Sequence, residues 1–151
     1  MKRISFMAIV LCACFCFFNT KAAAQENFTE GSVWRVNLID IKPGRLTDFW
    51  RDLRQNLKPI WEEYKKAGII TNYTVNIKST TDEPGDWDVA IAFEYKNWGA
   101  FDGMGAKTDP ITLKAYGTAE ARTAAAVKRT ENGITVASFL MRNVTPKDLP
   151  K

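Results

Sequence analysis

The chain has 151 residues, of which 46% are apolar and 25% charged, and it carries a formal net charge of +4 with no histidine. This length suits one domain, and the composition excludes a wholly disordered chain, collagen and a coiled coil. The lack of histidine excludes Ser-His-Asp and Cys-His catalysis, His-ligated zinc and His-ligated haem, and we expect neither a metal nor an organic cofactor.

The first 24 residues have the three parts of a secretory signal peptide. A basic start at residues 1–3 is followed by an apolar run over 4–18 and by small residues at 22–24. The run is shorter than the roughly 20 residues that a membrane span needs. We expect cleavage after Ala24, export to the periplasm or the medium, and no membrane insertion afterwards. The alternatives are an uncleaved anchor and a lipoprotein site around residues 11–14.

Cleavage would change the charge and the thiol content. The signal contains three of the 21 basic residues and none of the 17 acidic ones, so 18 basic and 17 acidic residues remain. This near balance removes the case for a nucleic-acid partner. All three cysteines, Cys12, Cys14 and Cys16, also leave with the signal. An exported domain without disulfides depends on its apolar core, and dimerisation would add to its stability.

After the signal we expect a leader over 25–31, one domain over 32–143 and a polar tail over 144–151. Alternating apolar residues predict a strand over 32–41, with Trp34 on one face and Arg35 on the other. Apolar residues at steps of three and four predict a helix over 45–67, which Pro59 should kink or restart near Lys58.

The rest of the domain is predicted to contain two strands, a helix and a last strand. Strands over 69–79 and 87–95 are separated by a short loop and should pair antiparallel, with Trp87 on the same face as Val89. A short helical turn is expected around Trp98. Asp109 and Pro110 then look like the cap and first residue of a helix to about residue 129, whose alanine-rich face should pack closely and whose weak point is Gly117. The last strand is expected over 134–143.

The order βαββαβ predicts an α+β, ferredoxin-like fold. Such a fold has a four-stranded antiparallel sheet with two helices on one face, which leaves the other face uncovered. Both faces of the first strand carry apolar residues. We therefore expect a homodimer in which two sheets meet face to face and form an α+β barrel.

Two segments, residues 57–70 and the strand 87–95, resemble the dimeric α+β barrel superfamily, above all its small secreted bacterial members. The likeness extends over about 32–143. It implies either a cofactor-free quinone-forming monooxygenase, a lactone isomerase, a haem-degrading enzyme or a protein without catalytic activity. Haem-handling members usually present a histidine, which this chain lacks. Monooxygenase members resemble one another in using Asn, Trp and Arg in a pocket, and Asn37, Trp98 and Arg35 are residues of these types.

Six side chains are candidates for ligand binding: Arg35, Asn37, Tyr73, Glu94, Trp98 and Arg142. An arginine in an apolar cavity could bind a carboxylate or enolate oxygen, although Arg35 could instead pair with Glu94 or another acid where the two copies meet. A desolvated Glu94 could act as a general base. Tyr73 could donate a proton or only pack. Arg142, like Arg35, could bind a ligand oxygen or pair with an acid. Trp98 follows a strand, where a cavity mouth is expected, whereas Trp34, Trp50 and Trp61 are expected in the core.

An acidic loop with Asp82, Glu83, Asp86 and Asp88 could hold calcium, but its spacing favours a solvated turn at Pro84-Gly85. Two functions remain open. The first is an exported homodimer that binds a small apolar or aromatic ligand, on which it could carry out cofactor-free oxygenase or isomerase-like chemistry. The alternative is a non-catalytic dimerisation or protein-interaction module of the cell envelope. An open cavity on which the six candidates converge would favour the first function, and a filled one the second.

Overall fold

The computed structural model describes residues 27–80 and 86–148. The predicted signal peptide lies outside the described residues, as do Asp82 and Glu83 of the acidic loop. The chain divides into two units, Glu30–Asn143 on one side and Met1–Thr29 with Val144–Lys151 on the other. In the second unit the Thr29 hydroxyl donates to the Thr145 carbonyl oxygen at 3.4 Å. The features described below belong to Glu30–Asn143 unless stated.

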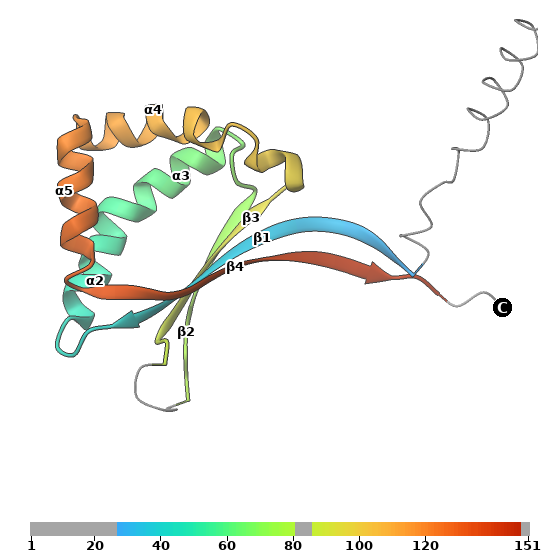
Figure 1. Cartoon of the computed structure of the whole chain (residues 1–151), viewed down its shortest axis with the longest axis horizontal. Helices are drawn as coiled ribbons and strands as arrows, with labels where there is room; N and C mark the ends of the chain where they lie inside the picture. Colours follow the sequence, from blue (N-terminus) through green and yellow to red (C-terminus); the bar gives the residue numbers. More distant parts are fainter. Residues whose placement is uncertain (1–26, 81–85, 149–151) are drawn as a thin grey trace, which may run out of the picture. The chain divides into compact units, whose positions relative to one another are not determined.

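Four strands form one antiparallel sheet in the order β2-β3-β1-β4 (Figure 1). The strands are β1 (Phe28–Ile41), β2 (Asn72–Ile77), β3 (Val89–Tyr95) and β4 (Gly133–Pro146). β3 pairs antiparallel with both β1 and β2. β4 also runs antiparallel to β1, because Gly133 lies against Asp40 and the Asn143 side chain donates to the Ser32 hydroxyl at 2.9 Å. The predicted ferredoxin-like topology is therefore confirmed.

The two outer strand boundaries differ from the prediction. β1 begins at Phe28, so the end of the expected leader is strand, and β4 starts at Gly133 and continues to Pro146, into the expected tail. Polar composition suggested loose segments there, but strand pairing uses main-chain groups that every non-proline residue carries. Gly133 has no room for a side chain, since a Cβ would lie 2.8 Å from the Asp40 carbonyl oxygen.

The predicted first helix is present and changes register at its proline. It consists of α2 (Leu46–Asp52), a π-helical turn (Leu53–Leu57) and α3 (Lys58–Lys66). The Lys58 N–H donates to the Leu53 carbonyl, five residues back. Pro59 has no N–H, so the wide turn lies where a helical hydrogen bond is lost in any case. The expected restart near Lys58 is confirmed.

The predicted second helix is two helices, α4 (Met104–Tyr116) and α5 (Ala119–Arg129), after a 3₁₀ turn at Trp98–Phe101. Asp109 and Pro110 do not begin a helix, because Pro110 lies inside α4. The chain breaks at Gly117, where φ is +82°, and Thr118 caps α5 by accepting a hydrogen bond from the Ala121 N–H at 3.1 Å. The weak point at Gly117 was predicted correctly.

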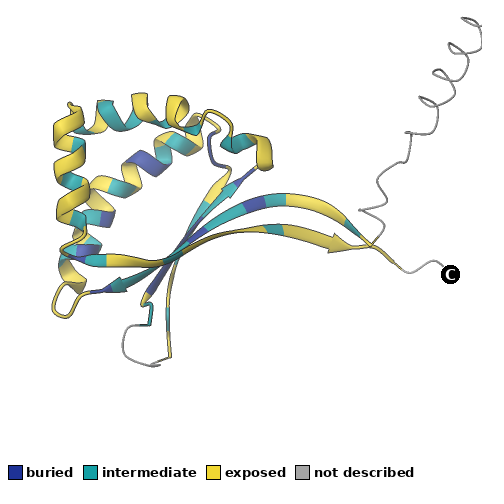
Figure 2. Cartoon of the chain, viewed as in Figure 1, coloured by how far each residue is buried: buried dark blue, intermediate teal, exposed yellow. Residues whose placement is uncertain are grey.

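The close packing expected for the alanine-rich face was wrong. No residue of α4 or α5 is buried, and Figure 2 shows both helices mostly exposed, whereas the buried residues gather on the sheet, α2 and α3. Figure 1 shows α4 beside α3, with α5 turning back toward α2. α4 packs against α3, and among the alanines of α5 only Ala125 is partly covered.

The two faces of the sheet differ in what covers them. On the helix side, Val89, Ile91 and Tyr95 of β3 pack with Phe49 and Trp61. The other face carries a smaller apolar cluster, with buried residues that form its floor and partly buried residues that border them. The floor consists of Val36, Ala90 and Ala92, and the border of Trp34, Leu38 and Trp87.

Trp87 was therefore placed on the wrong face by the prediction. The strand begins only at Val89, so the alternation of side chains does not extend back to Trp87. Of the three core tryptophans expected, Trp61 is buried, while Trp50 and Trp34 are half-buried.

Candidate functional site

The register of the sheet separates the six predicted site residues. Arg35 and Asn37 lie opposite Phe93 and Ile91, on the helix side. Glu94 lies opposite Trp34, on the uncovered face. The predicted alternative of an Arg35–Glu94 pair is therefore wrong, and the Arg35 guanidinium lies over the Phe101 ring instead, 5.2 Å from its centre.

The other candidates have local partners. Asn37 accepts a hydrogen bond from the Ser138 hydroxyl at 2.9 Å. Tyr73 donates to a Glu62 carboxylate oxygen at 2.5 Å, and burial, together with that hydrogen bond and the carboxylate charge, raises the pKa of Tyr73 to about 12. Arg142 forms an ion pair with Glu30. These side chains do not meet at one point.

Aromatic rings fill the helix side of the sheet. The Trp61 ring packs edge-to-face on Phe93, with ring centres 5.1 Å apart, and on Tyr73 at 5.3 Å. The Phe101 ring lies 4.4 Å from Tyr95 and 6.2 Å from Trp98. Burial raises the pKa of Tyr95, and the nearby positive charge of Arg35 partly opposes that rise. Phe101 thus brings two of the six candidates together, Arg35 and Trp98, beside packed rings.

A groove between α3 and α4 has a volume of about 660 Å³. This volume lies within the range of small-molecule sites. Its walls are lined by Gln55, Asn56, Pro59, Ile60, Glu63, Pro110, Ile111, Lys114, Ala115 and Tyr116. None of the six predicted residues is among them. The groove was missed because its walls come from two helices whose packing the sequence does not reveal.

A hydrogen-bond network holds two residues of the groove wall, Asn56 and Tyr116. The Arg129 guanidinium donates to the Tyr116 oxygen at 2.6 Å and to an Asp52 oxygen at 2.9 Å. The second Asp52 oxygen accepts from the Asn56 amide at 2.6 Å. Three helices, α2, α4 and α5, are thereby tied together, and the Tyr116 side chain is held in a fixed position.

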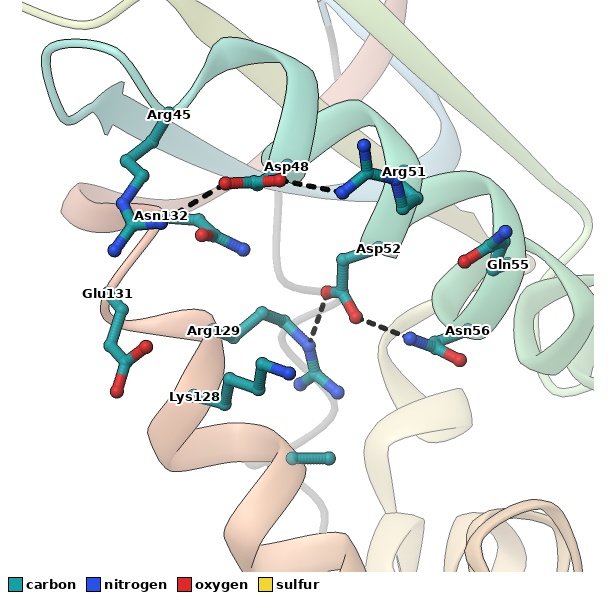
Figure 3. Close-up of a pocket in the computed structure, with 11 residues that line it drawn as sticks. Arg45, Asp48, Arg51, Asp52, Gln55, Asn56, Lys128, Arg129, Glu131 and Asn132 are labelled. Atoms are coloured by element: carbon teal, nitrogen blue, oxygen red, sulfur yellow. Dashed lines mark hydrogen bonds and ion pairs between the residues drawn. The ribbon is translucent and has the colours of Figure 1, made fainter.

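A charged pocket of about 380 Å³ lies next to the groove and shares Gln55 and Asn56 with it (Figure 3). Asp48 there accepts from Arg45 at 3.1 Å and from Arg51 at 2.7 Å. These exposed ion pairs each contribute little to stability. Since Arg45 and Arg51 pair with Asp48 and Arg129 pairs with Asp52, these groups offer little excess charge to a ligand.

Neither metal nor membrane features are found in the described part of the chain. Within residues 27–80 and 86–148 there is no group of three or more Asp, Glu, His or Cys side chains that could hold a metal ion. Of the acidic loop, Asp86 pairs with Lys78, and Asp88 accepts from the Ile41 N–H at 2.7 Å. In the same residues no helix has the length and apolarity to cross a membrane.

The chain was compared with known proteins. No family model and no curated protein matches it. Two crystal structures of dimeric ferredoxin-like proteins from an uncultured marine organism match with a TM-score of 0.47 each, at 11% and 13% identity. They cover 80% and 82% of this chain and 100% and 94% of their own. A dimeric protein of ferredoxin-like fold from Bacteroides fragilis matches with a TM-score of 0.38 at 16% identity, over 80% of this chain and 99% of its own. The strand order β2-β3-β1-β4, with helices on one face, is what identifies the fold of this chain as ferredoxin-like.

Proposed function

We propose that this protein is an exported homodimer that binds a small apolar or aromatic ligand and that two copies meet through the uncovered face of the sheet. The observation that carries the proposal is the apolar cluster on that face. Trp34, Leu38 and Trp87 border it and remain partly exposed, although no helix of the described chain lies over them. Burying apolar surface of this kind between two copies would stabilise the dimer by about 25 cal/mol per Å².

The neighbouring edge strand supports the same arrangement. β4 exposes five large apolar side chains within the main unit: Ile134, Val136, Phe139, Leu140 and Met141. β4 is also the outermost strand on its side of the sheet. Monomeric proteins rarely leave so much apolar surface together with a long strand edge, because both invite association. A two-fold axis would bury the same surface on both copies.

Dimerisation is tested by measuring the mass of the mature chain in solution. We expect a dimer at micromolar concentration by light scattering, and a monomer for Leu38→Lys, which places a charge on the uncovered face. Val127→Lys is the matched control, because Val127 is 61% exposed on α5. If Leu38→Lys is unfolded by circular dichroism, Thr74→Lys on the same face replaces it. A wild-type monomer, or a Leu38→Lys dimer, would contradict the proposal.

Ligand binding is tested separately by a thermal-shift screen of quinols, lactones and fatty acids. We expect at least one class to raise the Tm of the dimer, since a ligand that binds only the folded state stabilises it. The alternative function, a non-catalytic dimerisation or interaction module, is favoured by the rings that fill the helix side of the sheet. A dimer whose Tm no compound changes would support that alternative and contradict ligand binding.

A further inference from the structure

We infer that the groove between α3 and α4 binds the ligand and that the ligand is a small carboxylate with an apolar body. This inference rests on the proposed function, in which the protein binds a small molecule. It adds the site, the chemical class and the orientation of the ligand. Its basis is the distribution of polar and apolar groups along the groove.

The two helices run antiparallel along the groove. Tyr116 near the end of α4 is linked through Arg129 to Asp52, which also binds Asn56. In Figure 1, α4 begins beside the end of α3 and runs back along it. One end of the groove is therefore formed by Gln55, Asn56 and Tyr116, and the other lies toward Glu63.

Donors without a partner line the groove, with Gln55 and Tyr116 at the first end and Lys114 close enough to Glu63 to lower the pKa of that carboxyl. The Tyr116 oxygen already accepts from Arg129, so its own proton is left to donate. The Gln55 side chain makes no hydrogen bond and Lys114 no ion pair within residues 27–80 and 86–148. One hydroxyl, one amide N–H group and one ammonium are thus available to a ligand. Oxygen acceptors with a negative charge satisfy all three.

The opposite end would reject a second anion. Glu63 lines the groove there, and its hydrogen bond to Lys66, 2.6 Å long, lowers the pKa of the Glu63 carboxyl. The carboxylate is therefore charged at neutral pH. Lys114 also attracts Glu63, but through a longer-range interaction that forms no ion pair. A ligand with one carboxylate fits this asymmetry, with its charge at Tyr116 and its neutral end toward Glu63.

The stretch between the two ends is apolar. Pro59 and Ile60 of α3 face Pro110, Ile111 and Ala115 of α4. From Asn56 to Glu63 the axis rises about 10 Å, at about 1.5 Å per residue. This length suits an aryl-alkyl chain of a few carbons. The prolines add rigid apolar surface without an N–H that would need a partner.

The test uses 4-phenylbutyrate as the probe and its uncharged amide as the matched ligand. We expect the carboxylate to bind the mature wild-type protein by calorimetry and the amide to bind roughly tenfold more weakly. In methyl-labelled protein, the carboxylate should shift the NMR signals of Ile60 and Ile111. The signal of Ile134, exposed on β4, serves as the reference and should not move.

Three variants assign the contacts. Lys114→Gln and Tyr116→Phe should each weaken binding of the carboxylate about fivefold or more and bring it toward that of the amide. Ala115→Trp should fill the groove and abolish binding. Lys128→Gln, in the charged pocket, is the control and should bind like the wild type. Circular dichroism checks the fold of each variant.

Three outcomes would overturn the inference. They are equal binding of acid and amide, unchanged binding in Ala115→Trp, and shifts confined to signals outside the groove. If screened compounds bind but 4-phenylbutyrate does not, the groove assignment fails and the proposed function stands. If nothing binds while the protein remains dimeric, the ligand-binding part of the proposed function fails as well.

Discussion

Tyr73 illustrates how one residue combines packing and polar chemistry. Its ring packs on Trp61 of α3, and its hydroxyl donates to the carboxylate of Glu62, the residue that follows Trp61 in that helix. Burial removes water that would stabilise a phenolate, and the Glu62 charge repels one. A residue expected to bind ligand or to pack is thus found packing and hydrogen-bonded to a carboxylate, while its role toward a ligand stays a prediction.

This pair predicts a pH effect on stability. The pKa of Tyr73 is about 12 in the folded protein against an ordinary value of 10.0, so the folded state retains the proton longer than the unfolded state. Stability should therefore fall as the pH rises from about 10 to 12. In Tyr73→Phe this fall should be smaller, although burial also raises the pKa values of Tyr64 and Tyr95.

Urea denaturation between pH 9 and pH 12 measures the effect. Glu62→Gln keeps a hydrogen-bond acceptor without the charge, so its fall should lie between those of wild type and Tyr73→Phe. Identical pH profiles for all three proteins would show that the Tyr73–Glu62 bond does not persist in solution.

The break between α4 and α5 is the clearest feature at the level of the elements. Gly117 has φ of +82°, a conformation that side chains with a Cβ rarely adopt, and nothing lies within 4 Å of the position a Cβ would take. Its role is therefore conformational rather than steric. The break directs α5 back toward α2, which places Arg129 beside Asp52 and Tyr116.

Gly117→Ala should destabilise the fold by about 1 kcal/mol, because alanine is strained at positive φ. Gly105→Ala is the matched control within α4, where the backbone is helical and a Cβ would also meet nothing within 4 Å. That change should stabilise the protein by up to about 1 kcal/mol, from helix propensity alone. Urea unfolding gives both values, and changes of the same sign would contradict this account.

At the scale of the whole molecule, the N-terminal segment carries the prediction of where the protein functions. The basic, apolar and small-residue parts of residues 1–24 predict cleavage after Ala24. Mass spectrometry of the exported protein should therefore find a chain that begins at Gln25. An Ala24→Asp variant should slow processing, because a signal peptidase site takes small residues. A chain recovered with residues 1–24 attached would identify an anchor instead.

The candidate site could be predicted only in part. Alternation along β1 correctly placed Arg35 and Asn37 on the other face of the sheet from Trp34, since successive side chains of a strand point to opposite faces. The alternation could not predict which face of the sheet the helices cover. Glu94 lies on the uncovered face, away from Arg35 and Asn37. The groove residues gave little signal, because Gln55 and Lys114 look like ordinary exposed helix residues until the helices are placed.

The sequence by itself determined the local features: the periodic first helix with its restart at Lys58, the strand order along the chain, the weak point at Gly117 and the absence of histidine chemistry. These depend on spacing and residue type over a few neighbours. Only the tertiary structure decided which sheet face is covered, where Trp87 packs and which helix faces form a groove. Those outcomes depend on contacts between residues far apart in the chain, and the free energy of such contacts is not contained in any local pattern.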